Sequence, residues 1–328
     1  MARAWHLVTR PSGMPGPEHF TLKDLPTAEL AEGEVRVANR WLSVDPYMRG
    51  RMNDVKSYVP PFQVGAPLEG GAVGTVVESR AEGFATGDLV TSMLGWRDEA
   101  VGPAKAFTKL PALPVPEQQW LGNLGVTGAT AYFGLLRVAE AKEGDTVFVS
   151  AAAGAVGSAV VQIARLKGMR VIGAAGGEAK CAWVRELGAE ACIDYKAGPV
   201  LKQLMRAAPD GIDVYFDNVG GDHLDAALAT ARDFARFAIC GMIDTYNGEP
   251  PAPLRFLMRT ISARIRMQGF IFTDYMREMP AFVGEMAGWI GSGQMQSRET
   301  VMEGLESTPE AFLGLFRGEN MGKMLVKL

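Results

Sequence analysis

The stretch Thr146–Gly157, with the sequence TVFVSAAAGAVG, constrains the fold of this chain more than any other segment. It opens with the β-rich apolar run Thr146–Ser150, passes through small residues that include Gly154 and Gly157, and leads into the helical pattern of Val160–Leu166. A strand, a tight glycine turn and a helix in this order form the first unit of a dinucleotide-binding sheet. In such a unit the amides at the helix N-terminus hold the pyrophosphate of the cofactor.

The glycine turn departs from the usual fingerprint at one position. It reads Ala152-x-Gly154-x-x-Gly157, so an alanine takes the place of the first glycine. Small residues also close ordinary strand–helix turns, and the motif alone therefore leaves a purely structural turn open. Its position between a strand and a helix favours a cofactor site.

The end of the next strand indicates which dinucleotide binds. The predicted strand Arg170–Ala175 is followed by Gly176 and Gly177, and Glu178 and Lys180 come next. An NAD site usually has an acidic residue about 20 positions after the glycines. Here two glycines leave room, and a compact ammonium suits the extra phosphate of NADP. Glu178 could serve a ribose and Lys180 could be a solvated cation at a helix start, but we predict NADPH.

Composition excludes several classes of function. The formal net charge of −4 and the pI near 5.6 provide no basic field for nucleic acid. The uncharged stretches Trp120–Leu136 and Thr146–Ala164 are rich in Gly, Ala, Ser and Thr, so neither is predicted to span a membrane. Met1–Arg10 lacks a long apolar segment, and we expect no signal peptide.

Cysteine and histidine are scarce. Cys181, Cys192 and Cys240 lie in apparent α/β elements, which predicts reduced thiols and the cytoplasm rather than a disulfide framework. The chain has three histidines, and no Cys/His cluster has the spacing of a zinc site. We therefore predict a site without a metal.

The first 119 residues lack regular strand–helix alternation. Short strand candidates such as Val35–Trp41 and Gly74–Val77 are interrupted by Gly and Pro, which predicts a compact, largely antiparallel β domain. Tyr47 follows an Asp-Pro step, which starts a turn, so we expect it on a loop or at the start of a short helix. A tyrosine in such a place is often only a packing residue, and this alternative stays open.

From Trp120 onwards, small-residue helices lead into a steady alternation that predicts an α/β fold with a doubly wound parallel sheet. Further predicted strands are Ala191–Asp194, Ile212–Val219, Arg236–Met242 and Arg264–Ile271, and predicted helices are Ala179–Leu187, Pro199–Ala207, Asp222–Ala231 and Pro280–Gly291. The alternating segment Lys323–Leu328 predicts a last strand that rejoins the first sheet. We therefore expect one domain over residues 1–122 and 294–328 and another over residues 123–293.

Several of the predicted parallel strands end in small or polar residues, as in Asn218–Gly221 and Cys240–Met242. In an open α/β sheet these ends face the ligand crevice. Plain turn chemistry explains one such end well and several in a row poorly. The pattern therefore favours a ligand site at this edge.

Together these motifs resemble one family. The chain is similar to zinc-independent medium-chain dehydrogenase/reductases of the prostaglandin reductase and leukotriene hydroxydehydrogenase type, which include bacterial curcumin reductases and plant double-bond reductases. The resemblance rests on Leu42–Met52, Gly71–Val77, Gly125–Tyr132, Ala151–Ser158, Ala175–Cys181, Ile193–Lys196, Gly211–Gly221, Ala238–Asn247, Arg264–Phe272 and Gly318–Lys327. The chain departs from the family at Gly125–Thr130, where Gly-Met-Pro-Gly-Leu-Thr is commoner, and at Asp244, where serine is commoner. The first departure is expected to reshape the wall of the site that Gly125–Thr130 forms.

The resemblance implies a Rossmann NADP-binding domain and a GroES-like substrate domain. It places the pyrophosphate on Gly154, Ala155, Val156 and Gly157, and the adenosine 2′-phosphate on Lys180 and Tyr195. It assigns the rest of the cofactor groove to Asn218, Cys240, Gly241, Met242, Ile243, Asp244, Thr245, Tyr246, Phe270, Ile271, Phe272 and Asn320. It also implies that Tyr47 and Tyr246 flank the substrate, with Trp96 as a further candidate. Where the zinc-dependent cousins have ligands, this chain has Ser43–Asp45 and Leu68–Gly70, and no zinc set can be assembled.

The reaction that the resemblance implies is NADPH-dependent reduction of the carbon–carbon double bond of α,β-unsaturated ketones or aldehydes. Hydride addition at the β-carbon builds negative charge on the carbonyl oxygen, which needs donors aimed at it. Without a metal, the available donors are tyrosine hydroxyls and the hydroxyl of the nicotinamide ribose, and we predict Tyr246 and Tyr47 as the catalytic residues. An NADPH quinone reductase or a non-catalytic NADPH-binding protein on the same scaffold remains open. A carbonyl reductase of the short-chain type would need Tyr-x-x-x-Lys, which the sequence lacks.

Assembly is predicted from the last parallel strand. The candidate Ile265–Ile271 would lie at a sheet edge, and an exposed edge invites pairing with another chain. The resemblance also favours a homodimer with a continuous sheet. We therefore expect a homodimer that acts on a small enone.

Overall fold

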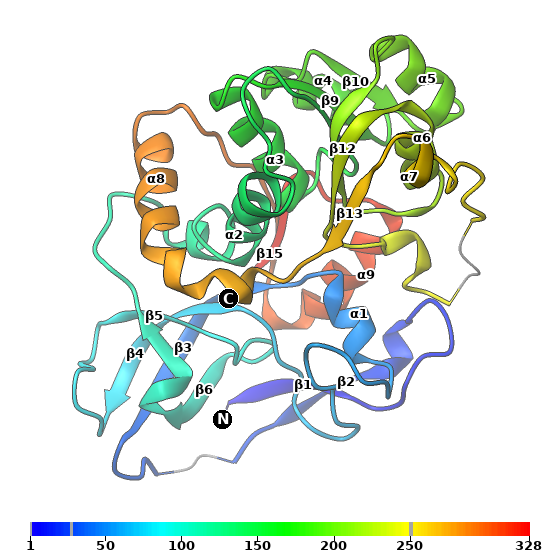
Figure 1. The fold of residues 1–328 in the computed structure, drawn as a ribbon. Coiled ribbons are helices and arrows are strands. Elements are labelled where there is room, and N and C mark those ends of the chain that lie inside the picture. The colour runs from blue at the N-terminus through cyan, green and yellow to red at the C-terminus, as the bar shows by residue number, and fades with distance from the viewer. Residues whose placement is uncertain (1, 27–28, 249–251) are drawn as a thin grey trace. The chain divides into compact units, whose positions relative to one another are not determined.

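The computed structural model describes residues 2–26, 29–248 and 252–328 (Figure 1). The chain divides into two compact units, the first of residues up to Leu121 with Glu299–Leu328 and the second of Gly122–Arg298. Residues 1, 27–28 and 249–251 fall within the predicted domain ranges but lie outside the described residues.

The first unit is built mainly of strands. Its elements are β1 (Arg3–Leu7), β2 (Phe20–Asp24), β3 (Glu34–Ser43), α1 (Tyr47–Arg51), β4 (Ala72–Ser79), β5 (Leu89–Ser92), β6 (Glu99–Pro103), β7 (Phe107–Lys109), β14 (Glu299–Glu303), α9 (Thr308–Arg317) and β15 (Lys323–Lys327). The main sheet has the order β14-β15-β3-β4-β5-β7, and β6 also pairs with β3. Within it β14 and β15 run parallel and the other pairs are antiparallel. This confirms the mainly antiparallel domain, and β15 is the predicted last strand that rejoins the first sheet.

The residue pattern of β3 explains why it lies at the centre of this sheet. Val35 and Val37 are fully buried while their neighbours are only partly covered, as expected for a strand with one face on the core. At its C-terminal end, Leu42 and Ser43 are both buried. There β3 pairs with β15 at Trp41–Ser43 and with β4 on its other side.

The second unit alternates strands and helices. Its elements are α2 (Val126–Phe133), β8 (Thr146–Val149), α3 (Ala155–Leu166), β9 (Arg170–Ala175), α4 (Glu178–Glu186), β10 (Ala191–Asp194), α5 (Val200–Ala207), β11 (Ile212–Asp217), α6 (Gly221–Thr230), β12 (Ala231–Ile239), α7 (Arg259–Ser262), β13 (Arg266–Gly269) and α8 (Met279–Gly291). The sheet has the order β10-β9-β8-β11-β12-β13, and every pair in it is parallel. Helices α2 and α3 cover one face, and α5 and α6 cover the other (Figure 1). The doubly wound parallel sheet is thereby confirmed.

Some element bounds differ from those predicted, for identifiable reasons. β11 ends at Asp217 rather than Val219, because the Asp217 carboxylate accepts the Val219 and Gly220 amides at 2.9 and 2.8 Å. β12 ends at Ile239, because the amides of Cys240 and Gly241 both turn to the Asp217 carbonyl at 2.9 and 3.0 Å. Hydrogen bonds of the loop thus replace the last rungs of both predicted strands.

Gly122 and residues 294–298 belong to the second unit, whereas the predicted boundaries placed them in the first domain. The Gln162 side chain, on α3, donates to the Gln296 carbonyl at 2.9 Å and accepts from the Gln296 amide at 2.7 Å. Arg165 donates to the Gln294 carbonyl at 2.8 Å. These bonds bind the segment to α3, and its sequence gives no sign of them.

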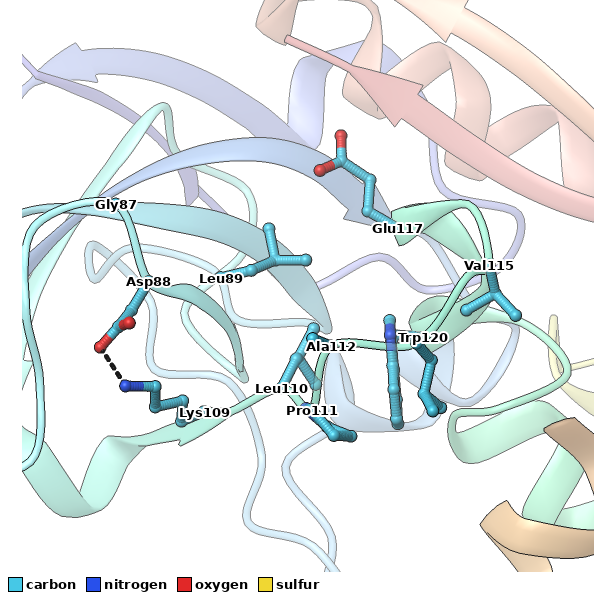
Figure 2. A pocket seen from close by; sticks show the side chains of 11 residues that line it. Gly87, Asp88, Leu89, Lys109, Leu110, Pro111, Ala112, Val115, Glu117 and Trp120 are labelled. Carbon is cyan, nitrogen blue, oxygen red and sulfur yellow. Dashed lines mark ion pairs between the residues drawn. The ribbon is translucent and has the colours of Figure 1, made fainter.

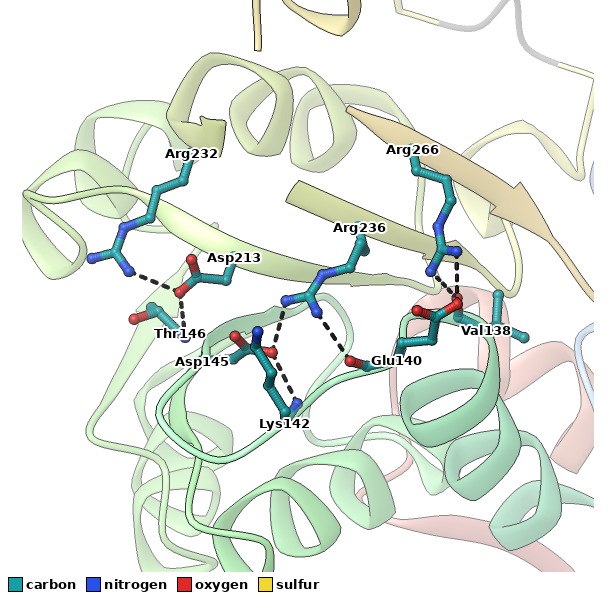
Figure 3. Close-up of polar contacts among 9 residues, drawn as sticks. All are labelled: Val138, Glu140, Lys142, Asp145, Thr146, Asp213, Arg232, Arg236 and Arg266. Atoms are coloured by element: carbon teal, nitrogen blue, oxygen red, sulfur yellow. Dashed lines mark hydrogen bonds and ion pairs between the residues drawn. The ribbon is translucent and has the colours of Figure 1, made fainter. Parts of the chain in front are cut away.

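The amino-terminal edge of the parallel sheet is closed by ion pairs (Figure 3). Asp213 accepts from the Thr146 amide and from Arg232, both at 2.8 Å. Arg236 donates to Asp145 at 2.7 Å, and Arg266 donates to the Glu140 carboxylate and the Val138 carbonyl. These contacts join the starts of neighbouring strands to the loops before them, so the opposite, carboxyl-terminal edge is the one left for a ligand.

Candidate active site

The strand order of the second unit locates a crevice. The order reverses between β8 and β11, and in open α/β sheets ligands bind outside the carboxyl ends of the strands at this point. Ser150 follows β8 and Asn218 follows β11. The Asn218 side chain donates to the Ser150 carbonyl at 2.8 Å, and the Asn218 backbone amide donates to the Ser150 hydroxyl at 2.8 Å. These two hydrogen bonds thus join the ends of β8 and β11 on either side of the switch point.

The glycine turn after β8 has the form that a pyrophosphate requires. The first hydrogen bond of α3 runs from the Ser158 amide to the Gly154 carbonyl at 2.9 Å. The amides of Ala155 and Val156 therefore precede the helix ladder and face outward at its N-terminus. A Cβ on Gly157 would overlap the carbonyl oxygen of Ala151 in the turn, so this position accepts only glycine. The predicted pyrophosphate residues fit the cofactor.

The turns after β9 and β10 meet at Gly176. A Cβ there would lie 2.5 Å from the Tyr195 hydroxyl, so the tyrosine folds over a site that only glycine leaves open. Lys180 lies in the first turn of α4 and is half-buried. Burial, and then the charge of Lys196, lowers the pKa of the Lys180 ammonium. Lys180 and Tyr195, predicted for the adenosine phosphate, therefore lie at one end of the sheet.

The loops after β11 and β12 are tied to one another. The Ile243 amide donates to the Asn218 carbonyl at 3.4 Å, and the Asp244 amide donates to the Val219 carbonyl at 3.2 Å. Through these bonds the predicted residues Cys240–Tyr246 come to the same edge as Asn218. A Cβ on Gly221, at the start of α6, would overlap the Asp244 carboxylate.

Tyr246 ends the short helical turn Ile243–Thr245, where the sequence alone gave only a turn residue. Its hydroxyl accepts a hydrogen bond from the Met242 amide at 3.4 Å. A Cβ on Gly241 would lie 2.9 Å from the same hydroxyl. The ring therefore folds back over the end of β12, and its hydroxyl lies beside the strand ends of the crevice.

Asp217 was missed by the sequence analysis, although it ends a buried apolar strand. Its Oδ1 accepts from the Tyr215 hydroxyl at 2.7 Å and from two loop amides, and its Oδ2 has no partner among the described residues. Burial raises the pKa of Asp217. Burial, and then Asp217, also raises the pKa of Cys240 to about 12, so this thiol stays protonated. The signal that could have found Asp217 is an acid inside an otherwise apolar strand end.

Two aromatic residues of the second unit, Phe270 and Phe272, follow the end of β13. Phe270 meets Phe216 edge to face at 6.1 Å, and a Cβ on Gly134 would overlap both rings. Ile271 and Phe272 follow and are half-buried. The first of the three predicted groove residues in this segment, Phe270, is therefore held in place by its packing against Phe216.

The remaining predicted residues, Tyr47, Trp96 and Asn320, belong to the first unit. Tyr47 is the first residue of α1 and packs on the margin of the core. Burial, and then the charge of Asp45, raises the pKa of the Tyr47 hydroxyl, so it keeps its proton. The Asn320 side chain donates to the Gly322 carbonyl at 2.9 Å.

The start of α1 is held by an ion pair that the sequence analysis did not predict. Lys323, only 5 % exposed, donates to the Val44 carbonyl at 3.1 Å and to the Asp45 carboxylate at 2.6 Å. Ser43 donates to the other carboxylate oxygen of Asp45. The contacts fix the turn immediately before Tyr47.

Trp96 lies inside the core of the first unit and is 1 % exposed. Its ring stacks on Phe20 at 5.6 Å and meets Phe312 edge to face at 5.8 Å. This burial favours a packing role over the predicted substrate contact. The sequence could not separate the two, because both of the packing partners are distant along the chain.

The first unit also contains a surface cavity of about 710 Å³ (Figure 2). Leu89, Leu110 and Trp120 contribute apolar walls, and the Asp88–Lys109 ion pair closes one side at 2.7 Å. The residues that line it include none of the predicted site residues.

Among the residues that the structure describes, no group of three or more His, Cys, Asp or Glu side chains could hold a metal ion. No helix in the described ranges has both the length and the apolar character to cross a membrane.

Comparison with known proteins identifies the family. A family described as "N-terminal domain of oxidoreductase" matches residues 3–110, and one described as "Zinc-binding dehydrogenase" matches residues 155–288. The NADPH-dependent curcumin reductase of Escherichia coli (strain K12) is 43 % identical over 99 % of this chain and 96 % of its own. The chain belongs to the medium-chain dehydrogenase/reductases of the prostaglandin reductase type. Prostaglandin reductase 1 of Mus musculus is 40 % identical over 99 % of both chains.

A solved structure supports the same family for both units. CurA from Vibrio vulnificus, in complex with NADPH, is 42 % identical and matches with a TM-score of 0.94 over 99 % of this chain and 98 % of its own. As a medium-chain dehydrogenase/reductase, the chain therefore has the Rossmann-type sheet and the mainly antiparallel sheet of its relatives.

Proposed function

We propose that the chain is an NADPH-dependent reductase of the carbon–carbon double bond in α,β-unsaturated ketones and aldehydes. The observation that carries this proposal is the 43 % identity, over nearly the whole length, with an NADPH-dependent curcumin reductase. The glycine turn at the switch point of the parallel sheet supports it, because its outward amides suit a dinucleotide pyrophosphate.

The second unit is proposed as the NADP-binding domain and the first as the substrate domain. NADPH, when bound, supplies the hydride for the β-carbon. The amides of Ala155 and Val156 would hold the pyrophosphate, and Lys180 and Tyr195 would bind the 2′-phosphate of the adenosine ribose. The loop residues after β11 and β12 would line the rest of the cofactor groove.

Tyr246 is proposed as the donor to the carbonyl oxygen of the substrate. Negative charge develops on that oxygen as the β-carbon accepts hydride, and a fixed hydroxyl stabilises it without reorganisation. The Tyr246 hydroxyl lies beside the end of β12, next to residues predicted for the cofactor groove, which supports its role. Tyr47 is the second candidate donor, supported by the resemblance and by a hydroxyl that burial keeps protonated.

A homodimer in the cytoplasm completes the proposal. β13 is the last strand in the order of the parallel sheet, so one side of it can pair with a second chain. The three cysteines are free thiols in the structure, which suits a reducing compartment.

The proposal is tested by NADPH consumption over enones, enals and quinones, with product identification by mass spectrometry. We expect saturated ketones and aldehydes as products, and faster turnover with NADPH than with NADH. Saturated carbonyl products distinguish double-bond reduction from carbonyl reduction, which would give unsaturated alcohols. Turnover of quinones alone would overturn the proposal in favour of a quinone reductase, and tight NADPH binding without any turnover would make the chain a non-catalytic NADPH-binding protein.

A further inference from the structure

Two lysines approach one another at the carboxyl ends of β9 and β10. Lys180 lies in the first turn of α4, and Lys196 comes two residues after the end of β10. The charge of Lys196 is close enough to lower the pKa of the Lys180 ammonium, after the larger effect of burial. Like charges are brought together at a cost, which an anion between them would offset.

The backbone of both turns is held by one carboxylate. Asp194 Oδ1 accepts the Gly177 amide and the Lys196 amide, each at 2.9 Å. A Cβ on Gly176 would lie 2.5 Å from the Tyr195 hydroxyl and 3.0 Å from Lys196 Cε. Tyr195 and Lys196 therefore both extend over the turn before α4. Any side chain at Gly176 would displace them.

The polar groups at this place suit a phosphate. Within the described ranges, the Lys196 ammonium has no carboxylate partner. Burial, and then Asp194, raises the pKa of Tyr195, so its hydroxyl keeps the hydrogen that it can donate. Tyr195 is 41 % exposed, so an incoming ligand can reach it. Asp194 is the acid of this cluster, and two amide donors already engage the oxygen that faces the turns.

We propose that Lys196 is a second cation of the adenosine 2′-phosphate site, which it shares with Lys180 and Tyr195, and that it sets the preference for NADPH over NADH. The inference rests on the proposed NADPH function and adds a specificity-determining residue to it. The ligand group is a phosphate monoester, which carries a charge of about −1.5 to −2 at pH 7. One ammonium balances only part of this charge, and two balance it fully.

The test measures dissociation constants of NADPH and NADH for the full chain by titration of nicotinamide fluorescence. Lys196→Ala should weaken NADPH about tenfold, since a charge-assisted phosphate contact is lost. NADH binding should stay unchanged. Lys180→Ala should also weaken NADPH binding. The double variant should lose most of the preference for NADPH over NADH. At about 1 M salt, where charges are screened within about 3 Å, the effect of Lys196→Ala should shrink.

Matched variants separate this role from others. Lys202→Ala removes an exposed lysine of α5 and should leave both dissociation constants unchanged. Lys196→Arg retains the charge and should keep the NADPH preference. Competition with 2′,5′-ADP should fall in Lys196→Ala, whereas competition with 5′-AMP should not.

Two results would overturn the inference. If Lys196→Ala binds NADPH as Lys202→Ala does, Lys196 is a solvated turn residue. If it weakens NADPH and NADH equally, its role is structural. Failure of the wild-type chain to prefer NADPH would instead contradict the proposed function, so the two failures are distinguishable.

Discussion

The two tyrosines proposed as donors can be examined by removing a single oxygen atom. Phenylalanine keeps the ring of Tyr246 in place over the end of β12 and takes away only its hydroxyl. Tyr246→Phe should lower kcat roughly 10- to 1000-fold, the upper end corresponding to a lost oxyanion donor. NADPH binding should remain intact, and steady-state kinetics with a saturating enone measures the loss.

Tyr47→Phe serves as the companion variant. If Tyr47 mainly orients the enone, KM rises, and if it is the donor, kcat falls. The double variant shows whether the two hydroxyls share the task. Retention of wild-type kcat/KM in the double variant would mean that neither tyrosine is catalytic.

At the scale of elements, the short helix α1 depends on a strand from the other end of the chain. Lys323 of β15 is buried and pairs with Asp45 just before α1, 278 residues earlier in the sequence. Asp45 is only partly buried, and removing the lysine leaves its carboxylate without a counter-charge. Lys323→Met should therefore lower the free energy of unfolding by about 1–3 kcal/mol, measured by chemical denaturation.

β15 offers its own control. Lys327 lies on the same strand but is exposed, and Lys327→Met should change stability little. Adding Asp45→Asn to Lys323→Met should recover part of the loss, because no uncompensated charge then remains at this place. Equal stability of Lys323→Met and Lys327→Met would show that this ion pair contributes little.

Local patterns in the sequence predicted most elements of the second unit. Apolar runs marked the strands, and Gly154 and Gly157 marked the start of α3. The Lys323–Asp45 pair and the loop contacts of Asp217 could not be predicted, because they join segments that no local pattern connects. Tyr246 is a case between these, since only the family resemblance distinguished it from a turn residue.

At the scale of the whole molecule, assembly provides a prediction. If the edge of β13 pairs with a second chain, light scattering at micromolar concentration should give a mass near twice the 35.2 kDa of one chain. Dilution should shift the mass downward only below the dissociation constant. A mass near that of one chain at every micromolar concentration would contradict the homodimer.

The interrupted first unit has a consequence for synthesis on the ribosome. The second unit is continuous, so it can fold as soon as it has emerged, whereas β3 waits for β15 at the far end of the chain. At about 5–20 residues per second, this delay lasts on the order of 15–60 s. During this delay, the nascent chain exposes the edge of β3 at Trp41–Ser43 that later pairs with β15. Slow codons or a stalled ribosome before β15 would prolong that exposure and favour aggregation of the unfinished chain.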